Sequence, residues 1–143
     1  MSETPKIGGV IISHGQVANE LLAAAETVVG DLSHISSVSI GWHDDVEMAK
    51  NEIERAIEHV SSGNGVLLLT DMFGGTPTNI AAMFLKRGEV EIVTGVNLSM
   101  VIKLATSKQA SLSALAKEIE QEGKEAICLA GELLEPQKFK KDA

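Results

Sequence analysis

Residues 66–77 read VLLLTDMFGGTP, and this stretch decides the fold. Its first five residues are a continuous apolar run that ends in threonine, which is typical of a strand buried on both faces. Residues 71–75 contain two glycines and predict a tight loop. Thr76 and Pro77 then predict the N-cap and the first residue of a helix. A buried strand, a short loop and a helix in this order indicate an α/β protein.

The rest of the chain continues this alternation in both directions. Short apolar runs predict strands, and apolar residues at helical spacing predict the helices between them. Asp44 and Glu47 fit a capping box at the start of the second helix. The predicted strands are 7–13, 37–42, 66–70, 90–94 and 125–130, and the predicted helices are 17–29, 45–60, 76–87, 98–106 and 112–119. We therefore expect five strands in a mostly parallel sheet with helices between them.

Length and composition restrict the possible functions. The chain has 143 residues, the length of one domain, and a formal net charge of −8. A nucleic-acid-binding domain needs a basic surface, and no Tyr, one Trp and three Phe are too few rings to stack bases, so no nucleic-acid partner is expected. Residues 1–6 do not resemble a signal peptide, and no apolar run approaches the ~20 residues of a membrane span, so we expect a cytoplasmic protein. The single Cys128 lies in the predicted strand 125–130 and is expected in the core.

His14 and Asp71 are the residues to which we assign chemistry. Each follows a predicted strand, and in open α/β sheets the functional groups gather at the carboxyl ends of the strands. A carboxylate bonded to one ring nitrogen of a histidine fixes the tautomer and leaves the other lone pair free for nucleophilic or general-base work. Simpler roles are open for each residue alone: a loop histidine bonded to backbone, and an Asx turn or cap.

Gly74, Gly75 and Thr76 supply the third part of the predicted site. Two glycines allow backbone N–H groups to converge, and the N-terminus of the helix that follows attracts anions. A Gly-Gly turn alone is weak evidence for a site. An imidazole, an orienting carboxylate and anion-binding amides on neighbouring loops together indicate phosphoryl transfer to a histidine.

Other chemical motifs are absent from the sequence. There is no GxxxxGK[ST] loop, and Gly8-Gly9 does not extend to GxGxxG, so no nucleotide is expected. No CxxC pair is present, and no metal or other cofactor is expected. The four histidines lie on different predicted elements without metal-ligand spacing: His14, His34, His43 and His59.

Three motifs together resemble a known family. They are VIISHG after the first predicted strand, LLLTDMFGGTPTN some 60 residues later, and GVNLSM beyond it. In this combination the sequence resembles the mannose-family enzyme IIA domain of the bacterial sugar phosphotransferase system (PTS), over residues 7–133. One departure is visible: Ser99 stands where the family often has proline.

The resemblance implies a role for each site residue. His14 would accept a phosphoryl group through Nε2 from the phosphorylated carrier protein HPr and pass it to a histidine on a PTS IIB component. Asp71 would hold Nδ1–H, and Gly74, Gly75 and Thr76 would donate hydrogen bonds to the phosphate. The chain would be a phosphotransferase component without a metal or cofactor.

The resemblance also implies an architecture. The sheet would be doubly wound with helices on both faces, and its last strand would be antiparallel and exchanged between the subunits of a homodimer. Residues 1–135 would form one domain, followed by a polar tail at 136–143. The IIB partner would be a separate protein, and contact with a membrane would be indirect, through a permease complex.

Three other functions can be compared with this one. The phosphotransfer subunit of a dihydroxyacetone kinase shares the fold and the early histidine, but the full DMFGGTPTN element favours the mannose type. A regulatory module, in which phosphorylation changes a protein contact, would use the same site. A receiver domain phosphorylated on Asp71 would need acidic residues after the first strand to hold magnesium, and Ser13-His14 stands there instead.

Overall fold

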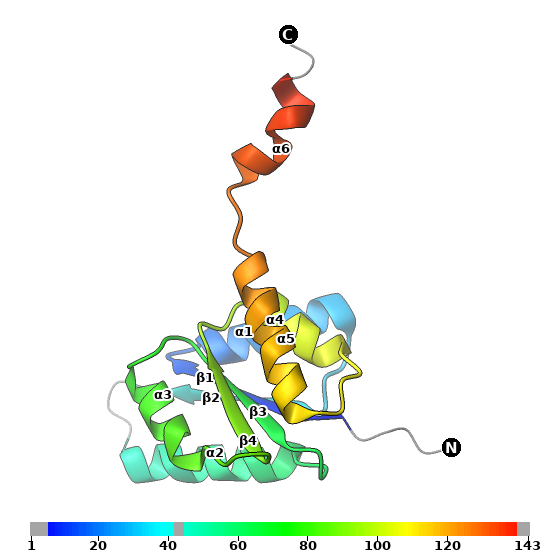
Figure 1. Ribbon diagram of the computed structural model, residues 1–143. Helices are drawn as coiled ribbons and strands as arrows, with labels where there is room; N and C mark the ends of the chain where they lie inside the picture. Colours follow the sequence, from blue (N-terminus) through cyan, green and yellow to red (C-terminus); the bar gives the residue numbers. More distant parts are fainter. Residues whose placement is uncertain (1–5, 42–44, 140–143) are drawn as a thin grey trace.

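The computed structural model describes residues 6–41 and 45–139, and the side chains among them as far as Leu134. Strands and helices alternate along most of the chain (Figure 1). The strands are β1 (Gly8–His14), β2 (Ile35–Ile40), β3 (Val66–Thr70) and β4 (Val90–Thr94). The helices are α1 (Val17–Val29), α2 (Val46–Val60), α3 (Thr76–Ala81), the 3₁₀ turn η1 (Ala82–Phe84), α4 (Leu98–Thr106), α5 (Leu112–Glu125) and α6 (Ala130–Phe139).

The four strands form one parallel sheet in the order β2-β1-β3-β4. The chain runs from β1 outward to β2, then crosses back to β3 on the other side of β1. Helices α2 and α3 cover one face of the sheet, and α1, α4 and α5 cover the other (Figure 1). The predicted doubly wound α/β class is therefore confirmed. The strand order reverses between β1 and β3, which is where such folds place their sites.

The core has two halves, one on each face of the sheet. Strand β1 supplies both, because its successive side chains point to opposite faces. Ile11 packs with α1, α4 and α5, whereas Val10 and Ile12 pack against α2 and α3, and all three are fully buried. Burial on both faces explains why β1 and β3 are continuous apolar runs in the sequence.

The prediction of a strand at 125–130 is wrong for the single chain. Helix α5 continues to Glu125, α6 begins at Ala130, and the described residues form four strands instead of five. The segment between these helices leads away from the sheet (Figure 1), so it has no neighbouring strand to supply the hydrogen bonds that a strand requires. Cys128 lies in this segment and is exposed, so its predicted place in the core is also wrong.

Several boundaries differ from the predicted ones by a few residues. Helix α2 is capped by Asp45, whose carboxylate accepts from the Glu47 N–H at 3.0 Å, while the predicted cap Asp44 lies outside the described residues. Helix α3 has Gly75 as its N-cap instead of Thr76, and it gives way to the 3₁₀ turn at 82–84 before the predicted end. The tail predicted from residue 136 lies in α6 as far as residue 139.

Ser99 occupies the second position of α4, after the N-cap Asn97. The Asn97 side chain accepts from the Met100 N–H at 3.1 Å. N–H groups in the first turn have no partner inside the helix, so serine and proline are both compatible with this position. The departure from the family pattern thus leaves a normally capped helix.

Within residues 6–41 and 45–139, no helix is both long enough and apolar enough to cross a membrane.

Candidate active site

Two adjacent strands bring the predicted histidine and carboxylate together. His14 is the last residue of β1, and Asp71 directly follows β3. These parallel strands are hydrogen-bonded neighbours, so their carboxyl ends lie side by side. Gly15 turns the chain away with a φ of +52°, a conformation that favours glycine, and its N–H donates to Ile40 O at 3.0 Å.

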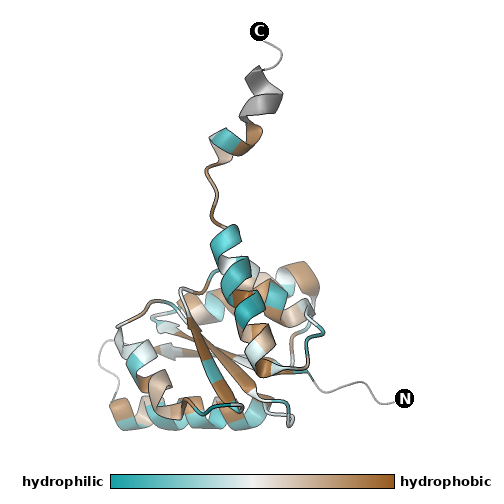
Figure 2. Ribbon diagram, in the orientation of Figure 1, coloured by the Kyte–Doolittle hydropathy of each residue, from teal (hydrophilic) through white to brown (hydrophobic). Residues whose placement is uncertain are grey.

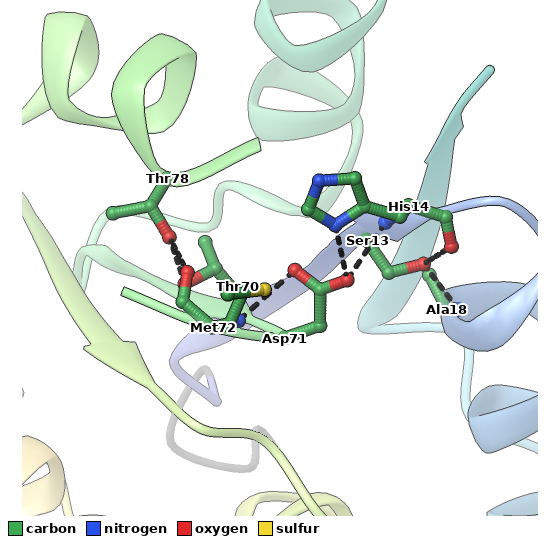
Figure 3. Close-up of polar contacts among 7 residues, drawn as sticks. All are labelled: Ser13, His14, Ala18, Thr70, Asp71, Met72 and Thr78. Carbon is green, nitrogen blue, oxygen red and sulfur yellow. Dashed lines mark hydrogen bonds and ion pairs between the residues drawn. The ribbon is translucent and has the colours of Figure 1, made fainter. Parts of the chain in front are cut away.

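The His14–Asp71 pair is held by two hydrogen bonds to one carboxylate oxygen (Figure 3). Asp71 Oδ2 accepts from the His14 backbone N–H at 2.9 Å and lies 2.7 Å from His14 Nδ1. Asp71 Oδ1 accepts from the Met72 N–H at 3.0 Å. The Asp71 side chain is 18% exposed and the His14 side chain 50% exposed, so the carboxylate is sheltered while the ring meets solvent.

These contacts keep Asp71 ionised. Partial burial alone would raise the pKa of Asp71, but the hydrogen bonds from the His14 N–H, the His14 ring and the Met72 N–H outweigh burial and lower this pKa below its ordinary value of 3.8. An ionised carboxylate can only accept hydrogen bonds, so His14 Nδ1 is the donor of the pair. In the neutral ring, Nε2 therefore carries the lone pair.

Gly75 lies directly against the imidazole. A Cβ atom at this position would lie 2.8 Å from His14 Cε1 and 3.3 Å from Nε2, so any larger residue would collide with the ring. Gly75 is the N-cap of α3, with no side chain capping that helix. The N-terminus of α3, with Thr76 as its first residue, thus lies beside the free nitrogen of His14. Gly74, with a φ of +89°, has open space around it and turns the loop.

Ser13 is a buried polar residue that no sequence motif assigns to the site. Its hydroxyl accepts from the Ala18 N–H at 2.6 Å and donates to His14 O at 3.1 Å (Figure 3). Helix α1 has no side-chain cap at Gln16, so Ser13 supplies a partner that the helix start otherwise lacks. The sequence does contain a signal for this role, because Ser13 is a polar residue within the apolar run 7–13.

Two further buried hydroxyls lie on the other side of the pair. Thr70 ends β3 and is fully buried, and Thr78 in α3 is 6% exposed. Thr78 Oγ1 lies 2.7 Å from Thr70 Oγ1 and 2.5 Å from Met72 O (Figure 3). The sequence singles out neither residue as part of the site.

The other histidines do not join the site. His34 directly precedes β2, at the opposite end of the sheet from His14. Burial lowers the pKa of His34, and the charge of Lys6 lowers it further, against a hydrogen bond with the Leu104 backbone that raises it. His59 is exposed in the last turn of α2, and His43 lies outside the described residues.

A groove begins at the site loop and runs along the free edge of the sheet. It has a volume of about 670 Å³ and lies between β4 and α5. Phe73, which is 80% exposed, lines its end near the site, and Ile127 lines it beyond α5. The charged side chains along it are Glu91, Lys117, Glu120 and Lys124.

Fold and site together define a doubly wound α/β protein with a carboxylate-oriented imidazole at its topological switch point. The sequence matches the family described as "PTS system fructose IIA component", EIIA-man, over residues 8–120. The chain therefore belongs to the mannose/fructose family of PTS IIA components. The resemblance inferred from the three motifs is confirmed.

Relatives of known name are also PTS components. The chain is 32% identical over 129 residues to the "PTS system mannose-specific EIIAB component" of Escherichia coli K12, a match that covers 82% of this chain and 38% of that protein. The chain thus spans well under half the length of that relative. It is 24% identical over 104 residues to the "PTS system fructose-specific EIIA component" of Bacillus subtilis 168, covering 72% of this chain and 71% of the relative.

Solved structures share the fold. The mannose/sorbose-specific IIA subunit from Enterococcus faecalis superposes with a TM-score of 0.78 at 31% identity, covering 87% of this chain and 94% of that one. The PTS IIA protein associated with the fucose utilization operon of Streptococcus pneumoniae superposes with a TM-score of 0.80 at 24% identity, covering 93% and 99%. At that identity the second likeness concerns the fold alone.

Proposed function

We propose that this chain is a phosphohistidine carrier in which His14 Nε2 accepts a phosphoryl group from phospho-HPr and passes it to a IIB component during sugar uptake. The observation that carries the proposal is the 2.7 Å contact between His14 Nδ1 and Asp71, which directs the free Nε2 toward Gly75. Membership of the PTS IIA family supports the same reaction class.

The transfer is a displacement at phosphorus. The Nε2 lone pair of His14 forms a new N–P bond while the N–P bond of the donor histidine breaks, and the donor imidazole leaves with that electron pair. Nδ1 keeps its proton throughout, so the phosphorylated ring of His14 is cationic. The Asp71 carboxylate, 2.7 Å away, stabilises this charge. A histidine of the IIB component then attacks the same phosphorus.

We infer that the start of α3 binds the phosphoryl oxygens. Pro77 has no N–H, and the N–H groups of Thr76 and Thr78 precede the first intrahelical bond, which runs from Asn79 N to Gly75 O at 2.9 Å. We assign phosphate binding to the Gly75 and Thr76 amides and the Thr76 hydroxyl, with Gly74 allowing the loop to turn. Charge stabilisation and positioning then account for the catalysis, without a metal or cofactor.

Labelling by phosphoenolpyruvate, enzyme I and HPr tests the assignment of His14. Wild-type protein should gain one acid-labile phosphoryl group, and His14→Ala should gain none. His59→Ala is the matched control, because that exposed histidine lies in the last turn of α2 and should label like wild type. Labelling of His14→Ala at the wild-type rate would show that the acceptor is another residue.

Asp71→Asn tests the role of the carboxylate. Asparagine keeps an acceptor for the His14 N–H but removes the negative charge, so transfer from phospho-HPr should slow by about 100-fold. The melting temperature should fall by only a few degrees, because the side chain lies at the edge of the sheet. Rapid-quench kinetics and calorimetry measure the two effects. A large loss of stability at an unchanged transfer rate would instead make Asp71 a structural residue.

We also propose a homodimer in which residues 125–130 add to β4 of a second copy as an antiparallel strand. Ile127 is 79% exposed and Leu129 68% exposed in the single chain. Figure 2 shows this apolar segment standing clear of the body, between α5 and α6. Strand β4 has a free edge, and the groove beside it offers space for an added strand.

A further inference from the structure

The loop between β3 and α3 carries Asp71 at its start and Gly75 at its end, yet few of its side chains are buried. Met72 is 55% exposed, Phe73 is 80% exposed, and Gly74 has no neighbour within 4 Å of a Cβ position. Apolar packing therefore restrains this loop weakly. The contacts that hold it in place must be mostly polar.

Thr78 makes the buried polar contacts that close this loop. Its hydroxyl oxygen lies 2.5 Å from Met72 O and 2.7 Å from Thr70 Oγ1 (Figure 3). A hydroxyl has one proton and can also accept. Both contacts are satisfied together when Thr78 donates to the Met72 carbonyl and accepts from the Thr70 hydroxyl.

The two partners of Thr78 are the residues on either side of Asp71. Both backbone polar groups of Met72 are hydrogen-bonded. Its N–H donates to Asp71 Oδ1, and its carbonyl accepts from the Thr78 hydroxyl. Thr78 itself belongs to α3, the helix that begins at Gly75 against the His14 ring. One side chain thus connects the segment that carries the carboxylate to the helix that faces Nε2.

We propose that Thr78 is a positioning residue, which sets the distance between the His14–Asp71 pair and the N-terminus of α3 through its hydroxyl. This inference rests on the proposed phosphoryl transfer. Thr78 touches neither His14 nor the reacting atoms, so its effect acts through the backbone of Asp71 and Gly75. Small displacements of this kind reduce the rate of a step that depends on alignment.

The test compares three variants of the full chain. Thr78→Val keeps the shape of the side chain and removes the hydroxyl, whereas Thr78→Ser keeps the hydroxyl. Thr106→Val is the matched control, because the Thr106 hydroxyl is exposed and donates to Ile102 O within its own helix. We expect Thr78→Val to lower kcat for transfer from phospho-HPr by about tenfold with little change in KM, and Thr78→Ser and Thr106→Val to behave like wild type.

Nuclear magnetic resonance supplies a readout that does not depend on transfer. In Thr78→Val the ¹⁵N resonances of the His14 ring should shift, and the Met72 amide should exchange its hydrogen faster than in wild type. Thr78→Ser should restore both signals. Wild-type signals and kcat in Thr78→Val would overturn the inference. If wild-type protein takes no phosphoryl group from phospho-HPr, the proposed function fails, while these signals still decide whether Thr78 positions the pair.

Discussion

Contacts on three sides fix the position of His14. The Asp71 carboxylate accepts from the backbone N–H and from Nδ1 of His14, and the Ser13 hydroxyl donates to the His14 carbonyl. Gly75, which has no side chain, leaves room beside Nε2. Each contact removes freedom from the ring or from the turn that carries it. Preorganisation of this kind would lower the barrier to the proposed transfer, because the ring need not be reoriented.

The lowered pKa of Asp71 predicts a pH dependence of stability. Its folded pKa lies below the ordinary value of 3.8, so the ionised carboxylate stabilises the fold above pH 3.8. This contribution declines as the pH falls from about 4 through the lower, folded pKa. Urea unfolding should show wild type more stable than Asp71→Asn by about 1 kcal/mol at pH 7, and the difference should shrink toward zero in acid. A difference that grows as the pH falls from 5 to 3 would contradict the assignment.

Gly75→Ala should impair transfer through a steric contact with His14. The added methyl would lie 2.8 Å from Cε1, so either the ring or the loop must move. We expect the rate of phosphorylation by phospho-HPr to fall by about tenfold. Gly131→Ala is the control, because Gly131 in α6 has open space around its Cβ position and does not contact His14. Equal rates for the two variants would show that the ring tolerates the methyl group.

The sequence was sufficient to predict that His14 and Asp71 lie together, and it was insufficient to predict the residues that support them. His14 and Asp71 each follow a buried strand, and the general rule for open α/β sheets brings such positions together. Gly75 was predicted from its motif, but as an amide donor; its packing against the ring depends on the three-dimensional path of the loop. Ser13, Thr70 and Thr78 contact partners that no spacing rule brings together.

At the scale of elements, the central strands were the most predictable part. Strands β1 and β3 are buried on both faces, so their sequences must be apolar throughout, and this pattern differs from that of a helix. The apolar pattern predicts β2 two residues late because it is weakened by the half-buried serines Ser36, Ser37 and Ser39. Helix starts were misplaced by one residue where two adjacent residues could both serve as caps.

The segment 125–130 shows why an apolar run cannot by itself specify a strand. The run EAICLA has the composition of a strand, but a strand forms only beside an edge that accepts its hydrogen bonds. Within one chain the segment pairs with none of the four strands, and it links two helices instead. In the proposed homodimer the partner's β4 would supply such an edge, and the sequence of one chain does not describe that contact.

At the scale of the whole molecule, the exposed apolar segment predicts dimerisation. Wild-type protein should sediment at twice the mass of one chain, and the double variant Ile127→Asp, Leu129→Asp should sediment as a monomer. Burying each of these side chains contributes about 1.5–3 kcal/mol, which a buried aspartate would forfeit. Leu85→Asp is the control, since Leu85 is 55% exposed outside this segment. A monomeric wild type at micromolar concentration, measured by analytical ultracentrifugation, would contradict the proposed exchange.

The placement of β1 between β2 and β3 has a consequence for synthesis of the chain. His14 and Asp71 are 57 residues apart, and they meet only when β3 pairs with β1. A nascent chain that stops before Val66 already contains the imidazole, but it lacks the carboxylate, the glycine loop and the strand that aligns them. Pairing over this distance costs loop-closure entropy. The His14–Asp71 pair therefore forms only when β3 has paired with β1. A chain that ends before Val66 contains His14 without its carboxylate partner.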